Sequence, residues 1–372
     1  MAAYWNIYIA ITLVCSLVVT RLAMPLLLRL CQRKGLYDVP DERKIHHTNN
    51  IPRLGGMLFV PSMLIGASAS LAMMVGLEGR EFLHLDLTSM LVLTGMFILY
   101  LIGILDDLFG MPATLKFVIQ LIVSLFLPFC GLYIHNLYGL FGIYEIAPWI
   151  GYPLTIFTTL LIVNAINLID GIDGLSSSLS FIAILVFGIL FLRHGLSLYV
   201  IYCAGLLGSV AVFFCYNMFG NPAKGTKTFM GDTGSLTLGY ALSFLAIRYI
   251  MTCTETDIQN MHATALLVPY TLLLVPCFDL IRVALMRLKR GVSMFFPDKT
   301  HIHHKCMQAG FTMHQALGII ILLQLFYGGL NGGLVLLKSH ISIIVSIDVA
   351  LFIFFNLWLN NRIRSRQTIQ KV

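Results

Sequence analysis

The chain has 372 residues, of which 58% are hydrophobic and 11% are charged, and its mean hydropathy is +0.87. Because a soluble domain carries about 25% charged residues, this composition excludes a water-soluble globular protein and predicts a polytopic membrane protein. The net charge of +7 comes from loops between apolar segments rather than from a separate basic domain. It therefore does not indicate nucleic-acid binding.

Apolar segments of roughly the 20 residues that a membrane-spanning helix needs follow one another along the chain. They lie at 4–30, 54–76, 88–105, 114–132, 149–168, 176–193, 196–219, 233–251, 263–286, 312–335 and 341–359. We therefore expect an all-α polytopic integral membrane protein with about eleven transmembrane helices. Residues 1–372 are expected to form a single transmembrane domain, with a basic tail at 360–372.

The distribution of Lys and Arg predicts the orientation in the membrane. If the N-terminus lies outside, the outer side receives only Arg80, Arg193, Arg248 and Lys338, and Arg21 falls within the first segment. That leaves nineteen of the 24 basic residues in inner loops or at inner helix ends. Cytoplasmic loops are enriched in Lys and Arg, so we expect a cytoplasmic C-terminus in the cell inner membrane. The basic inner face suits anionic lipids or a phosphorylated substrate.

Polar residues that are unusual beside apolar segments collect on this inner side. They are Asp106 and Asp107 in "GILDDLFGM", Asn164, Asn167, Asp170 and Asp173 in "NAINLIDGIDGL", Asn217 and Asp232 in "CYNMFGNPAKGTKTFMGDTGS", and His301, His303 and His304 in "FFPDKTHIHHK". The first inner loop adds Lys44, His46 and His47. The outer loops hold only scattered charges, so the asymmetry predicts an active site on the cytoplasmic face.

Two of these motifs leave structural alternatives open. Asp106 and Asp107 point about 100° apart if they lie on one helix, so one is expected to act on a substrate while the other orients a ligand. They are also compatible with a simple helix end at the membrane interface. The polar residues of the 164–173 run recur every third position. They therefore either spiral around a cleft, or the helix breaks at Gly171 and Gly174.

The remaining motifs favour phosphate and a hard cation. "GDTGS" resembles a phosphate or metal loop, although helix capping by Asp232 or Thr233 explains it almost as well. The histidines of "HIHHK" offer donors and positive charge to phosphate oxygens. A zinc site that includes Cys306 is disfavoured, because no fourth ligand has suitable spacing and Asp and Asn oxygens prefer Mg²⁺.

In their order and spacing these motifs resemble the polyprenyl-phosphate N-acetylhexosamine-1-phosphate transferase family, whose peptidoglycan relative is the phospho-N-acetylmuramoyl-pentapeptide transferase. The resemblance covers nearly the whole chain, from "RKIHHTNNIPRLGG" through "NAINLIDGIDGL" and "FMGDTGSLTLG" to "PDKTHIHH". The "HIHH" form is similar to the branch that transfers N-acetylglucosamine phosphate, whereas the peptidoglycan branch more often has three consecutive His. The first loop is one residue longer than the family spacing, which leaves either His46 or His47 at the family position.

The resemblance implies transfer of N-acetylglucosamine-1-phosphate from a UDP-sugar to undecaprenyl phosphate, with release of UMP and the start of a lipid-linked cell-surface polysaccharide. It implies that Asn167 and Asp232 hold Mg²⁺, or Mn²⁺ in its place, and that Asp106 or Asp107 acts on the lipid phosphate. It assigns substrate binding to Lys44, Asn164, Asp170, Asp173, Asn217, His301, His303 and His304. Membrane lipids are expected partners, and a homodimer is left open.

Two other classes of membrane protein are less compatible with the sequence. A secondary transporter would show repeated halves and polar sites near the middle of the membrane, whereas no internal repeat is evident and the polar residues lie at inner helix ends. A membrane scaffold or receptor would explain the apolar chain but not the convergence of polar loops on one side. The transferase is therefore the favoured interpretation.

Overall fold

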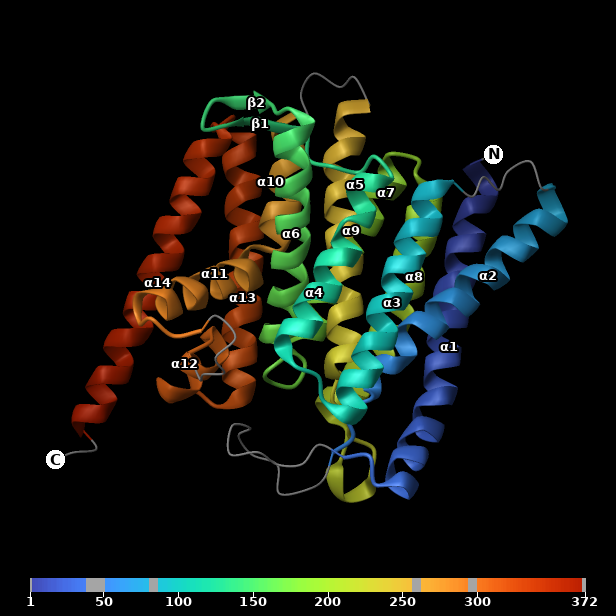
Figure 1. The fold of residues 1–372 in the computed structure, drawn as a ribbon, viewed down its shortest axis with the longest axis horizontal. Helices are drawn as coiled ribbons and strands as arrows, with labels where there is room; N and C mark the ends of the chain where they lie inside the picture. Colours follow the sequence, from blue (N-terminus) through green and yellow to red (C-terminus); the bar gives the residue numbers. More distant parts are fainter. Residues whose placement is uncertain (1, 38–50, 80–85, 256–261, 294–299, 370–372) are drawn as a thin grey trace.

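The computed structural model describes residues 2–37, 51–79, 86–255, 262–293 and 300–369. Figure 1 shows long helices running side by side, with the N-terminus and the C-terminus at opposite ends of the bundle. Among the described residues, nine helices are long and apolar enough to cross a membrane. They are α1 (Ala2–Lys34), α2 (Phe59–Glu78), α3 (Leu87–Phe109), α6 (Pro148–Ile169), α7 (Leu175–Arg193), α8 (Ser197–Phe219), α9 (Gly231–Glu255), α13 (Met313–Leu336) and α14 (Ile341–Ile369). The chain is therefore a multi-pass membrane protein.

The two other predicted spans are helical but broken. Segment 263–286 becomes α10 (His262–Leu272) and α11 (Leu274–Lys289), which meet at an angle of 70°. Segment 114–132 becomes α4 (Ala113–Ser124) and the single turn α5 (Phe126–Phe129). Each break lies close to a proline, Pro276 or Pro128, which removes one helical hydrogen bond because proline has no N–H. Hydrophobic length alone did not predict these interruptions.

Short elements connect the helices at both ends of the bundle. β1 (Asn136–Leu140) and β2 (Ile143–Glu145) form an antiparallel hairpin, an element that the all-α prediction missed. The hairpin lies at the opposite end of the bundle from α12 (Ile302–Gln308) in Figure 1. The 3₁₀ turns are η1 (Gly55–Leu58) and η3 (Pro222–Lys224).

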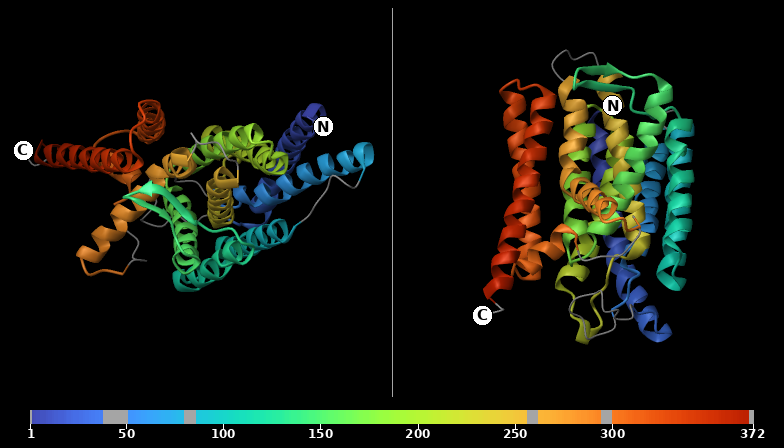
Figure 2. Two further views of the ribbon diagram at one scale, coloured as in Figure 1. Left: turned by 90° about the horizontal axis from the view of Figure 1, so that it is seen from above. Right: turned by 60° about the vertical axis from the view of Figure 1, so that its left-hand side comes forward.

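Helix α9 is the centre of the bundle. In its apolar segment 89% of the residues are buried, against 22% in α13, and it packs against α3, α6 and α7. Figure 2 shows α9, in yellow, in the middle of the bundle when it is viewed from above. The start of α9 is therefore held in place by several neighbouring helices.

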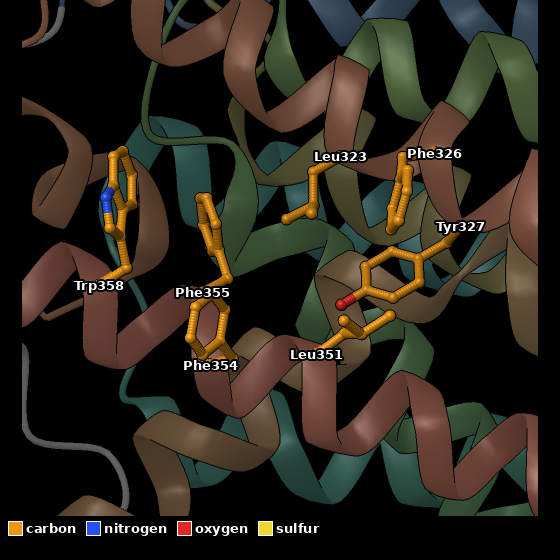
Figure 3. A pocket seen from close by; sticks show the side chains of 7 residues that line it. All are labelled: Leu323, Phe326, Tyr327, Leu351, Phe354, Phe355 and Trp358. Carbon is orange, nitrogen blue, oxygen red and sulfur yellow. The ribbon is translucent and has the colours of Figure 1, made fainter.

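The flank formed by α13 and α14 is apolar. An open pocket between these two helices (Figure 3) is lined by Leu323, Phe326, Tyr327, Leu351, Phe354, Phe355 and Trp358. Phe354 is 70% exposed, which in water would be unfavourable for so large a ring. Such a surface is suited to contact with lipid tails.

The packing of α3 against α9 depends on a glycine, which generates a first prediction. A Cβ atom at Gly103 would lie 2.3 Å from the Cα of Thr233, so Gly103→Ala must push the two backbones apart. We expect it to destabilise the protein by about 1–3 kcal/mol, as overpacking typically does. The matched control is Gly76→Ala, because a Cβ atom there meets no atom within 4 Å.

The melting temperature in detergent should fall for Gly103→Ala and stay the same or rise slightly for Gly76→Ala, since Ala is the better helix former. Equal melting temperatures for the two variants would contradict the close packing of α3 on α9.

Candidate active site

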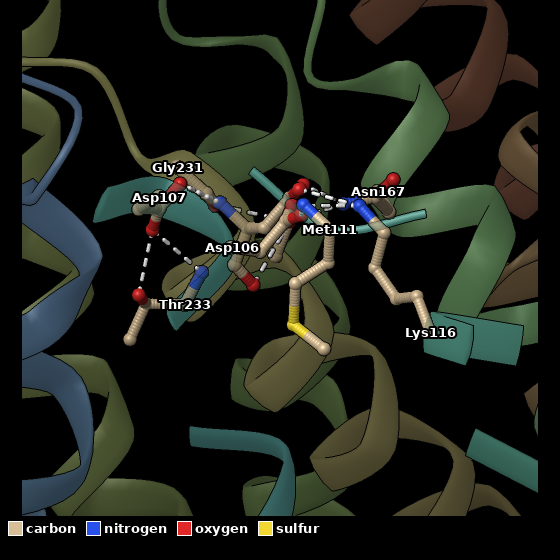
Figure 4. Close-up of polar contacts among 9 residues, drawn as sticks. Asp106, Asp107, Met111, Lys116, Asn167, Gly231 and Thr233 are labelled. Atoms are coloured by element: carbon tan, nitrogen blue, oxygen red, sulfur yellow. Dashed lines mark hydrogen bonds and ion pairs between the residues drawn. The ribbon is translucent and has the colours of Figure 1, made fainter. Parts of the chain in front are cut away.

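Asp107 of α3 holds the first turn of α9 (Figure 4). Its Oδ1 accepts from the backbone N–H of Asp232 at 2.8 Å, and its Oδ2 accepts from the N–H and the hydroxyl of Thr233 at 2.9 and 2.6 Å. The first N–H groups of a helix have no partner within that helix, so Asp107 is a cap supplied by another helix. This contact fixes the backbone of Asp232 and so the position from which its side chain extends.

Asp106 and Asp232 converge on one ammonium group. Nζ of Lys116, which is provided by α4, lies 2.7 Å from Oδ2 of Asp106 and 2.7 Å from Oδ2 of Asp232. Oδ1 of Asp106 accepts from the N–H of Met111 at 2.7 Å. The two neighbouring aspartates thus have different partners, as their angular separation on a helix predicted, yet both face the start of α9.

Lys116 is a site residue that the sequence analysis missed. It belongs to none of the polar motifs and contributes only to the number of basic residues on the predicted inner side. The available signal was its position, since it is the one Lys or Arg in the apolar run "MPATLKFVIQL" and lies nine residues after Asp107. A lysine in an apolar segment close to a membrane interface needs an anionic partner.

Asn167 and Asp232 are adjacent, as predicted. Nδ2 of Asn167, on α6, donates to Oδ1 of Asp232 at 2.5 Å and to the hydroxyl of Ser235 at 2.8 Å. The described residues contain no cluster of three or more His, Cys, Asp or Glu side chains suited to a metal ion. However, Mg²⁺ needs only one or two protein carboxylates when substrate phosphates complete its shell.

The oxygen donors around Asp232 fit such an ion. The position of the Lys116 ammonium shows that one cation can contact Asp106 and Asp232 together. Asn167 can add an amide oxygen after rotation of its side chain, because the O and N of an amide are close to isosteric.

The helix is interrupted between α6 and α7, and this interruption decides between the two predicted arrangements of the 164–173 run. Helix α6 ends at Ile169 and α7 begins at Leu175, so the polar residues do not spiral along one helix. Asn164 lies apart from the others, because its Nδ2 donates to Oε1 of Gln120 at 2.7 Å and to the carbonyl of Leu160 at 2.8 Å. It joins α6 to α4 instead of facing Asp232.

The turn at 170–174 is tied to the loop that precedes α9. Asp173 is buried and forms an ion pair with Nζ of Lys227 at 2.5 Å. Asn217, at the end of α8, accepts from the N–H of Gly174 at 2.6 Å and donates to the carbonyl of Thr228 at 2.9 Å. These contacts bring Asp173 and Asn217 together as predicted and leave both of them largely committed to protein partners.

The titration of Asp170, in the same turn, is strongly perturbed. Burial, together with the negative charges of Asp173 and Asp107, raises the pKa of its carboxyl group to about 7. Such a perturbed group in a cluster of polar residues is typical of a functional site. A bound cation or a positively charged substrate contact would favour its ionised form.

The predicted histidines lie on and just before α12, against the acidic turn. Nδ1 of His301 lies 2.9 Å from Oδ2 of Asp279, a residue of α11. His303 is buried, and neither of its ring nitrogens has a hydrogen-bond partner among the described residues. A Cβ atom at Gly171 would lie 2.1 Å from Nε2 of His303, so the absence of a side chain at Gly171 allows this contact. The ring of His304 lies 4.2 Å from that of His303.

Burial lowers the pKa of His303 well below its ordinary value, and the neighbouring charges of His304 and His301 add to the effect. His303 is therefore neutral at pH 7. Burial likewise raises the pKa of the Cys306 thiol to about 12, so this sulfur is protonated at pH 7.

Helix α12 is held from its other side by α14. Nζ of Lys305 donates to Oδ1 of Asn356 at 2.9 Å, and Nε of Arg362 donates to the carbonyl of Ala309 at 3.2 Å. The Arg362 guanidinium also lies over the ring of Phe311, 4.4 Å from its centroid. Lys44, His46 and His47 lie outside the described residues, so their predicted roles stay predictions.

Comparison with known proteins identifies the family. The family model described as Glycosyl transferase family 4 matches residues 89–250. The chain is 31% identical over 355 residues to a Bacillus subtilis (strain 168) protein named "probable undecaprenyl-phosphate N-acetylglucosaminyl 1-phosphate transferase", with coverage of 94% of this chain and 89% of the relative. The chain belongs to glycosyl transferase family 4. This membership confirms the resemblance seen in the motifs.

Other members of the family show similar agreement. The Escherichia coli (strain K12) protein named undecaprenyl-phosphate alpha-N-acetylglucosaminyl 1-phosphate transferase is 31% identical over 297 residues, which are 79% of this chain and 75% of the relative. The Yersinia pestis protein of the same name is 32% identical over 291 residues, which are 77% and 74% of the two chains. The region matched by the family model runs from α3 into α9 and so includes Asp106, Asp107 and Asp232.

The raised pKa of Asp170 generates a second prediction. Because the folded protein prefers the protonated carboxyl group, Asp170 supports folding below its ordinary pKa near 4 and loses that contribution as pH rises through about 7. Asp170→Asn stays neutral at every pH, so its melting temperature relative to wild type should increase between pH 4.5 and pH 8 in the absence of substrates.

The control is Asp86→Asn at the exposed cap of α3, for which the difference from wild type should stay constant over this range. A constant difference for Asp170→Asn as well would rule out the desolvated carboxyl group.

Proposed function

We propose that this protein transfers N-acetylglucosamine-1-phosphate from UDP-N-acetylglucosamine to undecaprenyl phosphate at the cytoplasmic face of the inner membrane, and that its product starts a lipid-linked cell-surface polysaccharide. The observation that carries the proposal is the convergence of Asp106, Asp232, Asn167 and Lys116 at one end of α9. It is supported by relatives named for this reaction that align with most of the chain.

The reaction exchanges one phosphoanhydride bond for another. An oxygen of the lipid phosphate attacks the phosphorus that carries the sugar. The bond between that phosphorus and the oxygen that bridges it to the second phosphorus breaks, and UMP leaves with the bridging oxygen. Both reactants are anions, so Lys116 lowers their repulsion when it turns from the carboxylates toward phosphate. Mg²⁺ or Mn²⁺ held by Asp232, Asn167 and Asp106 would offset the charge that develops on the leaving phosphate.

Asp106 and Asp107 have different proposed roles. A phosphate monoester has a second pKa near 6, so the lipid phosphate needs little help from a general base at neutral pH. Both oxygens of Asp107 are engaged by the first turn of α9, and we assign it to positioning. Asp106 is the acid that orients the reactants, together with Lys116.

The acidic turn and the histidines would bind the nucleotide-sugar. Asp170 would contact the donor, while Asp173, through its ion pair with Lys227, and Asn217 would hold the turn in place. His301 and His304 contact its phosphates, and His303 supports them against Gly171. Lys44 adds a phosphate contact from the first inner loop.

Activity and its dependence on a divalent cation form the third prediction. Purified wild-type protein with radiolabelled UDP-N-acetylglucosamine and undecaprenyl phosphate should produce a labelled lipid and UMP. EDTA should stop the reaction and Mg²⁺ should restore it. Asp232→Asn should lower kcat by about 100-fold or more, the range seen when one electrostatic contact to the transition state is removed, while Asp86→Asn should retain full activity.

UDP-N-acetylmuramoyl-pentapeptide tests the alternative donor of the peptidoglycan branch, and we expect no labelled lipid from it. Full activity of Asp232→Asn in EDTA would contradict the assignment of Asp232 as a metal ligand. Failure of the wild type to produce a labelled lipid would contradict the proposed function.

The proposed orientation places the site in the cytoplasm. If the bent α10–α11 pair and the α4–α5 segment each cross the membrane, eleven crossings put the N-terminus outside and the C-terminus inside. The opposite positions of the two termini in Figure 1 support an odd number of crossings. The β1–β2 hairpin would then face outward and η3 inward.

Cysteine labelling provides the fourth prediction. In a background without other reactive cysteines, Glu145→Cys in the hairpin should react with a membrane-impermeant maleimide in intact cells, whereas Ala223→Cys in η3 should react only after permeabilisation. Both positions are exposed in the structure, so accessibility to water is matched. The reverse labelling pattern would invert the orientation and move the site to the outer face.

A further inference from the structure

A side chain is inserted into the backbone at the bend between α10 and α11. Thr271 and Val275 are four residues apart, so in an unbroken helix the N–H of Val275 would donate to the carbonyl of Thr271. Instead, Nε2 of Gln324 donates to the carbonyl of Thr271 at 2.6 Å, and Oε1 of Gln324 accepts from the N–H of Val275 at 3.3 Å. Gln324 comes from α13 and is 4% exposed.

The inserted amide makes the break tolerable inside the membrane. Unpaired backbone groups are costly in an apolar environment, and one primary amide satisfies two of the groups that the bend releases, the carbonyl of Thr271 and the N–H of Val275. Pro276 contributes separately, because without an N–H it cannot donate to the carbonyl of Leu272. The helical pattern continues on both sides, with the N–H of Leu273 donating to Pro269 and that of Cys277 donating to Leu273.

The bend determines where α11 leads. Figures 1 and 2 show α11 lying across the bundle and projecting from it, while the neighbouring spans run along it. Asp279 lies about one turn beyond Val275, is 1% exposed, and accepts from Nη2 of Arg282 at 2.6 Å and from the N–H of Ile302 at 3.1 Å. It also contacts His301, at 2.9 Å. A change in the direction of α11 would therefore move the support of His301.

We propose that Gln324 is a positioning residue for the active site: by inserting its amide between Thr271 and Val275, it keeps the α10–α11 span bent and so places Asp279 against His301. Gln324 lies on α13, whereas the acidic half of the site is built from α3, α4, α6 and α9. The consequence for catalysis rests on the proposed function, but the structural part does not.

The fifth prediction tests the bend directly by the distance between two spin labels. Labels are placed at Leu288, near the end of α11, and at Phe109, at the end of α3, both of which are exposed, in an active background without native cysteines. Helix α11 has 16 residues and is about 24 Å long, so a change of direction of about 20° moves its far end by about 8 Å. Gln324→Met keeps a long unbranched side chain and removes both contacts, so it should shift or broaden the distance distribution.

Two further variants distinguish the effect of Gln324 on the bend from the effects of neighbouring residues. Pro276→Ala restores an N–H but leaves the inserted amide in place, so it should keep the wild-type distance; a large shift would assign the bend to the proline instead. Tyr327→Phe is the matched control, because Tyr327 lies on α13 about one turn from Gln324 and the change removes its buried hydroxyl contact with the carbonyl of Asp348 on α14. It should change neither distance nor activity.

Activity then tests the connection to His301. Gln324→Met should lower kcat about 10-fold or more, and in a His301→Ala background it should lower it less than 2-fold further, since residues that act through one another are not additive. An unchanged distance in Gln324→Met, or equal effects of Gln324→Met in both backgrounds, would overturn the proposal. If the wild type makes no labelled lipid, the proposed function fails while the spin-label distances still decide the role of Gln324 in the bend.

Discussion

The hydrogen bonds from the first turn of α9 to Asp107 are the contact on which the site depends. α9 is the most buried of the long helices, and its first N–H groups need acceptors that the surrounding apolar side chains do not provide. Asp107 supplies them from α3, and in doing so it fixes the position of Asp232 relative to Lys116 and Asn167. The same contact therefore completes a helix end and sets the geometry of the acidic cluster.

The concentration of like charge at this end of the bundle has an electrostatic cost. Asp106 and Asp232 share Lys116, Asp173 is paired with Lys227, and Asp170 has its pKa raised to about 7 by burial and by its acidic neighbours. A protein selected only for stability would replace some of these carboxylates with neutral residues. Their presence is consistent with the cation-assisted function proposed above.

The sequence predicted the long apolar helices well, because their length and hydrophobicity are direct consequences of the membrane. The orientation taken from the Lys and Arg bias stays a prediction. Sequence-based prediction failed where a tertiary contact decides the outcome. Asn164 belongs to the polar run but pairs with Gln120, and Lys116 belongs to no motif but joins two aspartates. At the bend, the N–H of Val275 donates to Gln324, about fifty residues away in the chain, and no local pattern could reveal this contact. Membership in the family, in contrast, could be inferred from the order of several motifs.

The hydrogen bonds between α14 and the region of α12 bear on the order in which the site is assembled during synthesis. The acidic cluster is assembled from residues between Asp106 and Asp232, whereas the histidine helix is fixed by Asn356 and Arg362, which the ribosome adds more than a hundred residues later. Since chains fold from the N-terminus as they emerge, the acidic half can form early, while the histidine helix gains its contacts with α14 only near the end of synthesis. A nascent or truncated chain that lacks α14 would thus have the acidic cluster without these contacts on the histidine helix.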